Sequence, residues 1–149
     1  MVIFFLVYAI IERVKILKDK VNFMEINIYL HEDSWNQGKP QETLMGEIKL
    51  LNNTIVIETN EEGKTYRQFL SFEKVFAITH EVPYNTGVFN REINLYFDLR
   101  SWSKCNPKIS FQGHVIEEDC TSQYITVIAD GYKHLISNSK IFSCSYERQ

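Results

Sequence analysis

Cysteine, proline and glycine are all scarce in this chain, which has 3 Cys, 3 Pro and 6 Gly among 149 residues. An odd cysteine count without CxxC spacing is typical of neither a disulfide scaffold nor a structural zinc site. So little proline and glycine excludes a disordered or fibrous protein. The cysteine usage favours a reducing compartment, and we therefore expect a globular, cytoplasmic protein.

The chain also lacks a strong charge. Its net charge is −3, made up of +2 for residues 1–23, −5 for residues 24–90 and 0 for residues 91–149. A protein that binds nucleic acid by bulk electrostatics is expected to be basic, so this class is disfavoured. The negative charge of residues 24–90 instead offers a surface for a basic partner.

No apolar run reaches the roughly 20 residues of a membrane-spanning helix. The longest, Met1–Ile11, is followed by mostly basic residues, and apolar residues continue at helical spacing to Leu17. We expect an N-terminal helix that packs on the rest of the protein or on a partner. Two alternatives stay open: membrane contact through residues 1–17, and a true translation start at Met24.

What the chain does contain is an internal repeat. Residues 25–35 read EINIYLHEDSW, and 67 positions later residues 92–102 read EINLYFDLRSW. Matches continue through paired glycines, Gly46 with Gly113, and through residues 71–76 with residues 137–142. An ordered series of this kind indicates a tandem duplication of one supersecondary unit. We expect an N-terminal segment at 1–23, a first β-repeat at 24–90 and a second at 91–149.

Each repeat has the pattern of five strands. The first strand alternates apolar and polar residues, and a long polar loop with a tryptophan follows it. Glycine-containing turns then mark hairpins between the later strands. The predicted strands are Glu25–His31, Met45–Leu51, Thr54–Thr59, Tyr66–Leu70 and Val75–Thr79, then Glu92–Asp98, Gln112–Glu118, Tyr124–Ala129, Tyr132–Ile136 and Ile141–Tyr146. The fold class is therefore all-β.

The strand order, with one long loop, two tight hairpins and a short link before the fifth strand, resembles the SH3-like small barrels, including the Sm-like ones. The resemblance concerns the fold alone, since the ligand-binding residues of those proteins have no counterparts here. Two architectures stay open: two tandem small barrels, or one fused ten-stranded barrel or sandwich.

The polar side of the first strand, which includes Glu25, Asn27 and Tyr29 and which we expect to face solvent, is unchanged between the repeats. The apolar side, which includes Leu30 and which we expect to face the core, drifts among Ile, Leu and Phe. One interpretation is that the polar row makes a contact, between the copies or with a partner. The other is a scaffold role, with the tyrosine covering the neighbouring unit. The tryptophans of the long loops either anchor a ligand or cap the ends of the barrels. The candidate binding residues are Glu25, Asn27, Tyr29, Trp35, Glu92, Asn94, Tyr96 and Trp102.

No catalytic or metal-binding motif is visible. The four histidines have no metal-ligand spacing, and a nucleophilic pair such as Cys144 with His134 rests on no pattern in the sequence. We predict no enzymatic activity, no cofactor and no metal.

The sequence favours a non-catalytic protein-interaction module of the adaptor or inhibitor type. Its size and acidity resemble those of small bacterial immunity proteins. Two alternatives stay open: lipophilic-ligand binding in a fused barrel, and single-stranded nucleic-acid binding through exposed aromatics. The basic residues for the second are Arg100, Lys104, Lys108 and Lys133. An exposed edge strand or the apolar N-terminal segment would allow a homodimer.

Overall fold

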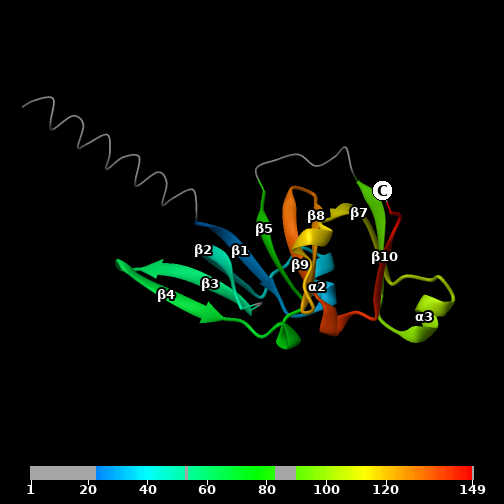
Figure 1. Cartoon of the computed structure of the whole chain (residues 1–149), viewed down its shortest axis with the longest axis horizontal. Helices are drawn as coiled ribbons and strands as arrows, with labels where there is room; N and C mark the ends of the chain where they lie inside the picture. Colours follow the sequence, from blue (N-terminus) through cyan, green and yellow to red (C-terminus); the bar gives the residue numbers. More distant parts are fainter. Residues whose placement is uncertain (1–22, 53, 83–89, 149) are drawn as a thin grey trace, which may run out of the picture.

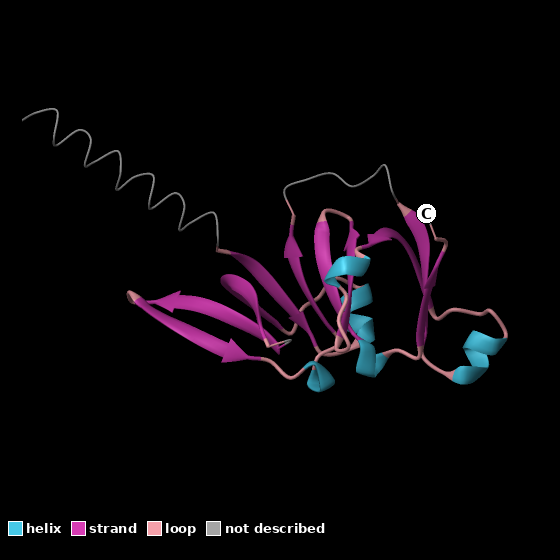
Figure 2. Ribbon diagram, viewed as in Figure 1, coloured by secondary structure: helices cyan, strands magenta, loops and turns pink. Residues whose placement is uncertain are grey.

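The computed structural model describes residues 23–52, 54–82 and 90–148, and in these ranges the protein is all-β (Figures 1 and 2). The described residues contain ten strands, which form one antiparallel sheet. The strands are β1 (Met24–Tyr29), β2 (Glu42–Leu51), β3 (Thr54–Glu61), β4 (Lys64–Phe69), β5 (Ala77–Glu81), β6 (Arg91–Tyr96), β7 (Ile109–Val115), β8 (Tyr124–Ala129), β9 (Tyr132–Ser137) and β10 (Ser143–Tyr146). Within the described ranges, no helix is long and apolar enough to span a membrane.

The strands pair in the same order in both parts of the chain. Residues 23–82, the first half, pair in the order β5-β1-β2-β3-β4, and residues 90–148, the second half, in the order β10-β6-β7-β8-β9. The halves are joined by antiparallel pairing of β5 with β9, which we call the seam. In the described residues, neither half pairs its own fourth strand with its own fifth.

These observations confirm the all-β class and the ten predicted strands, and they show one continuous sheet. The resemblance to SH3-like barrels and the predicted repeat boundaries stay predictions. The N-terminal helix predicted in residues 1–23 lies almost wholly outside the described residues.

Short helical segments lie between the strands. The structure places two helices in the predicted polar loops, α2 (Glu32–Asn36) and α3 (Leu99–Ser103). In the described ranges, 3-10 turns follow strands at η1 (Phe72–Lys74), η3 (Glu117–Asp119) and η4 (Asn138–Lys140). The sequence pattern missed α2 and α3, because five residues are too few to reveal a helical period.

The described residues form two hydrophobic cores, and each core takes residues from both halves. The core of the first half is mainly isoleucine, and it includes Tyr124 and Leu135 from the second half. The core of the second half includes Tyr29, Phe76 and Ala77 from the first half. Because each core is completed across the seam, the two halves stabilise one another.

Strand β2 changes partners along its length, and Gly46 marks the change. Residues 42–46 pair with β1, and residues 47–51 pair with β3. A Cβ on Gly46 would lie 2.5 Å from the carbonyl oxygen of Glu58. In β7, Gly113 has the same place, and its Cβ would lie 2.9 Å from the carbonyl oxygen of Ile128. The matched glycines therefore let two backbones approach closely where the strand passes from one partner to the next.

Replacing either glycine with alanine should destabilise the protein. The added methyl group would collide with backbone, which yields less easily than a side chain, so we expect Gly46→Ala and Gly113→Ala each to lower the free energy of unfolding by about 1–3 kcal/mol. Urea denaturation followed by circular dichroism measures the change. Gly38→Asn is the control, because Gly38 has a φ of +69° with open space around it and asparagine tolerates this conformation. An unchanged midpoint in both alanine variants would contradict the close approach.

Candidate binding cleft between the two halves

A cleft of about 550 Å³ lies at the junction of the two halves. Its walls come from β1 and α2 of the first half and from the β8–β9 hairpin of the second half. Figure 1 shows α2 near β9 in the middle of the molecule. Four of the candidate residues predicted from the sequence line this cleft: Glu25, Asn27, Tyr29 and Trp35.

Local hydrogen bonds hold α2 in place after β1. The backbone N–H of Trp35 and the hydroxyl of Ser34 both donate to the carbonyl of His31, at 3.1 and 2.7 Å. The side-chain oxygen of Gln41 accepts from the backbone N–H of Leu30 at 2.7 Å, and Ser34 Oγ lies 3.1 Å from the same oxygen. These contacts fix the direction in which Trp35 leaves the helix.

Trp35 reaches across the junction to the second half. Its indole Nε1–H donates to Nδ1 of His134 at 3.0 Å. Its ring packs against Phe76 and Phe111, each with a centroid separation of 5.5 Å. Trp35 is therefore a contact between the halves, and its partly buried ring also forms part of the cleft wall.

The contact with Trp35 fixes the protonation state of His134. Because Nδ1 accepts a hydrogen bond, the ring proton must sit on Nε2, which lies 3.2 Å from the carbonyl oxygen of Ala129 and donates to it. Burial lowers the pKa of His134, although the hydrogen bond to Ala129 and the charge of Asp130 act in the opposite direction. The imidazole is therefore held neutral with both nitrogens in use.

Asn27 and its counterpart in the second half, Asn94, accept equivalent hydrogen bonds. Thr43 Oγ1 donates to the side-chain oxygen of Asn27 at 2.9 Å, between β2 and β1. In the second half, Ser110 Oγ donates to the side-chain oxygen of Asn94 at 2.6 Å, between β7 and β6. The matched asparagines thus link the first and second strands of each half, which is reason enough for their identity.

The expectation that the polar row of β1 faces solvent is wrong in part. Glu25 is exposed, but Asn27 and Tyr29 are buried, and Leu30, expected inside, is exposed. Tyr29 packs in the core of the second half, so the physical reason is coverage of this face by the neighbouring half. This burial agrees with the interpretation in which the tyrosine covers the neighbouring unit.

The counterparts in the second half do not share the cleft. Glu92 is exposed, Asn94 is half-buried and Tyr96 is buried. Trp102 stands exposed on α3 and touches the ring of Phe142, with centroids 5.8 Å apart. The structure therefore brings together the four candidates of the first half and leaves those of the second half apart from them.

The sequence pattern missed the residues that the second half adds to the cleft. These are Asp130, Tyr132 and His134, from the β8–β9 hairpin. No local signal marks them, because they join the cleft only through the seam. Glu25 and Asp130 are the charged residues of the lining, which contains no Lys or Arg among the described residues, so the cleft is acidic and aromatic.

The structure bears on the nucleophilic pair named from the sequence, Cys144 with His134. Burial raises the pKa of the Cys144 thiol to about 11, so the reactive thiolate is not the resting form near neutral pH. Neither nitrogen of His134 is left to act as a base. In the described ranges, no group of three or more His, Cys, Asp or Glu side chains is arranged to hold a metal ion.

Comparison with known proteins gives no relative: no protein-family model, no curated protein and no solved structure matches the chain.

The neutral His134 predicts a pH dependence of stability. Its folded pKa is lowered, so below about pH 6.5 the unfolded chain binds protons that the folded protein resists. The contribution of His134 is therefore fully present above pH 6.5 and is lost as the pH falls from there towards the folded pKa. We expect His134→Gln, whose amide oxygen still accepts from Trp35, to flatten this part of the profile measured by urea denaturation.

Variants of two other histidines separate their contributions to the pH dependence of stability from that of His134. His80 also has a pKa lowered by burial, so His80→Gln should remove a further part of the slope. His31 is exposed, and His31→Gln serves as the control. A slope below pH 6.5 that is as steep in His134→Gln as in the unchanged protein would contradict the neutral assignment.

Proposed function

We propose that this chain is a non-catalytic protein-binding module of the adaptor or inhibitor type, and that its cleft takes a cationic side chain of a partner protein. The observation that carries this proposal is the composition of the lining. Glu25 and Asp130 supply negative charge, Trp35 and Tyr132 supply aromatic faces, and no lining residue described is Lys or Arg. A Lys or Arg side chain gains both Coulomb attraction and cation–π contact in such a place.

The proposal includes a tandem duplication as the origin of the two halves. Three shared features support it: the same strand order, the same hydrogen bond from a Thr or Ser hydroxyl to an asparagine oxygen, and the same close approach at a glycine in the second strand. Each lies at a position that matches in the sequence. Under this proposal the duplicated unit is a scaffold, and specificity comes from residues in which the copies differ, such as His134.

The alternative of single-stranded nucleic-acid binding has less support. Of the four basic residues that it would use, Lys108 pairs with Glu32, and Lys133 lies 3.3 Å from a carboxylate oxygen of Asp119. Their charges are therefore partly compensated. The acidic cleft itself would repel phosphate.

Lipophile binding is also less favoured than protein binding. The lining includes the carboxylates of Glu25 and Asp130 and the amides of Asn36 and Gln37, all exposed to solvent. An apolar ligand would remove water from these groups without offering them hydrogen bonds, which is unfavourable.

Neutralising the cleft should weaken partner binding. In a low-salt pull-down from the source organism, we expect the unchanged chain to retain a specific protein that elutes as salt is raised. Glu25→Gln combined with Asp130→Asn should weaken that complex by about 1 kcal/mol, or roughly fivefold, because exposed charges contribute little individually. Titration calorimetry with the purified partner measures the change.

Glu73→Gln provides the control, since Glu73 is also an exposed carboxylate but lies in η1, outside the cleft and away from the free sheet edges. Binding should be unaffected by this change. Equal affinity for the double variant and the unchanged chain would show that the cleft is not the site. Retention of an oligonucleotide on a filter at low salt, and of no protein, would favour the nucleic-acid alternative instead.

A further inference from the structure

The sheet has two free edges, and they lie at opposite ends of the molecule. In the described residues, β4 pairs only with β3, and β10 pairs only with β6. Figure 1 shows β4 at one end of the long axis and β10, near α3, towards the other. Every residue of β4 is exposed. Such edges present unpaired backbone N–H and C=O groups to a further strand.

The seam shows how a fourth strand and a fifth strand pair in this protein. It joins the fifth strand of one half, β5, to the fourth strand of the other, β9, over five antiparallel residue pairs. Backbone hydrogen bonds extend it at both ends, from Ser137 N–H to the carbonyl of Phe76 at 2.8 Å and from Val82 N–H to that of Gly131 at 2.9 Å. The free edges are the two strands that this arrangement leaves over: β4 is a fourth strand and β10 is a fifth strand.

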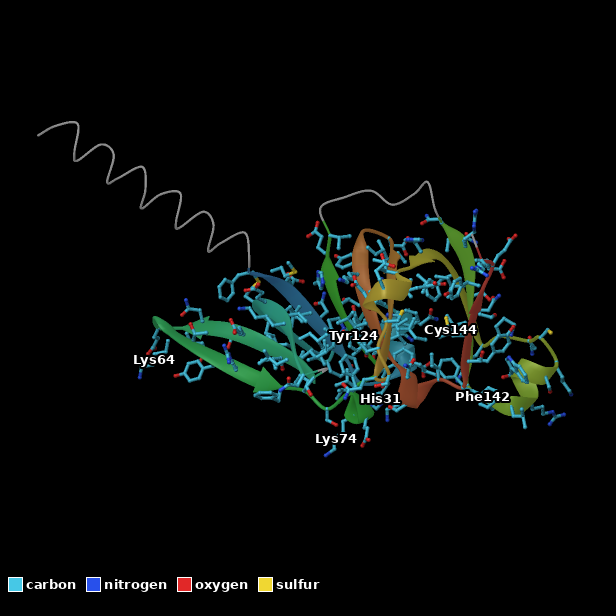
Figure 3. All side chains as sticks on the ribbon, viewed as in Figure 1. His31, Lys64, Lys74, Tyr124, Phe142 and Cys144 are labelled. Carbon is cyan, nitrogen blue, oxygen red and sulfur yellow. The ribbon has the colours of Figure 1, made fainter. Side chains whose placement is uncertain are left out.

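Side chains buried at the seam have exposed apolar counterparts at the free edges. Phe76 of the seam is 3% exposed, whereas Phe142, its match in the repeat, is 50% exposed. Leu135 is 4% exposed, whereas its match, Phe69, is 65% exposed. The labelled Phe142 lies in Figure 3 at the foot of β10, towards the end of the molecule.

Trp102 completes this set of exposed aromatics. It is the match of Trp35, which packs against Phe111 and His134 across the junction. Trp102 has no neighbouring half to contact and is 47% exposed. Large exposed apolar side chains gathered at an unpaired sheet edge are typical of an interface.

We propose that β10 of one chain pairs antiparallel with β4 of a second copy, in the register of the seam. Transferring the seam register to the matched positions predicts the pairs Ser143 with Leu70, Cys144 with Phe69, Ser145 with Gln68, Tyr146 with Arg67, and Glu147 with Tyr66. This self-association goes beyond the proposed function, because it uses surfaces outside the cleft.

The same assembly creates a second cleft. Glu92, Asn94, Tyr96 and Trp102 of one copy come to face Tyr66 and Gln68 of the next, at the positions matching Tyr132 and His134. The candidate residues of the second half, which lie apart in a single chain, thereby gain the neighbours that those of the first half already have.

Pairing of this kind is head-to-tail, and it therefore extends beyond a dimer. Each added copy uses one edge and presents another, so the product is a ring if the rotation closes and a filament if it does not. A two-fold dimer would instead pair β4 with β4 or β10 with β10, for which the seam offers no precedent.

Sedimentation of the full chain over a wide concentration range provides the first test. We expect species heavier than the 17.6 kDa monomer and heavier than a dimer. Phe69→Lys and Phe142→Lys each place a charge on an exposed edge position and should reduce these species to monomer without loss of folding. Met45→Lys changes an equally exposed apolar residue on an inner strand and should leave assembly intact. A monomer at every concentration, or assembly that survives both edge variants, would overturn the proposal.

Cysteine cross-linking tests the register and the polarity. Ser145→Cys and Gln68→Cys are made separately, each with Cys105→Ser to remove the exposed thiol, and diamide serves as the oxidant. We expect a disulfide-linked dimer only when the two variants are mixed, because the predicted pair joins β10 of one copy to β4 of another. Equal cross-linking of either variant alone would identify a two-fold dimer and reject head-to-tail pairing. Neither test depends on the cationic partner, so failure here and failure of the proposed function remain distinct.

Discussion

The pairing of β5 with β9 is the constraint on which the rest of the molecule depends. It joins two five-stranded units that have the same strand order into one sheet, and it completes the core of each with side chains from the other. Ser137 is fully buried there, and its hydroxyl donates to the carbonyl of Phe72 at 2.7 Å, so polar as well as apolar groups are satisfied across the seam. Without this pairing, Tyr29 of β1 would lose its place in the core of the second half, and the cleft would lose the wall that the β8–β9 hairpin supplies.

The contact between Trp35 and His134 fixes the hydrogen-bonding roles of both side chains at the junction of the two halves. A tryptophan N–H can only donate, so the neutral imidazole must accept, and burial favours the same neutral form. The site is thus organised by one fixed tautomer, with the negative charges of Glu25 and Asp130 at its exposed rim. Under the proposed function, such preorganisation would lower the entropic penalty of binding, because Trp35 and His134 already hold each other in place.

The sequence predicts the strands well because their signals are local. Alternation marks β1 and β6, and glycine turns mark the hairpins. The choice of partner for a fourth strand is not local, since the pattern of β9 is the same whether it meets β10 or β5. The burial of Tyr29 follows from that choice, and so does the role of His134, whose partner Trp35 lies far away in the chain. The sequence did not predict α2 and α3 for a different reason, because a helix of five residues is too short to show a helical period.

The stacking of Phe72 on Tyr124 across the seam, with ring centroids 5.2 Å apart, bears on how the protein folds. Each ring belongs to a different half, and both lie in the core of the first half. The hairpins of either half form from contacts close in sequence, but this core closes only when both halves are present. Folding should therefore proceed as a single cooperative transition, in which the slow step is the pairing of β5 with β9. The first half alone would stay incompletely packed until the second half had been synthesised.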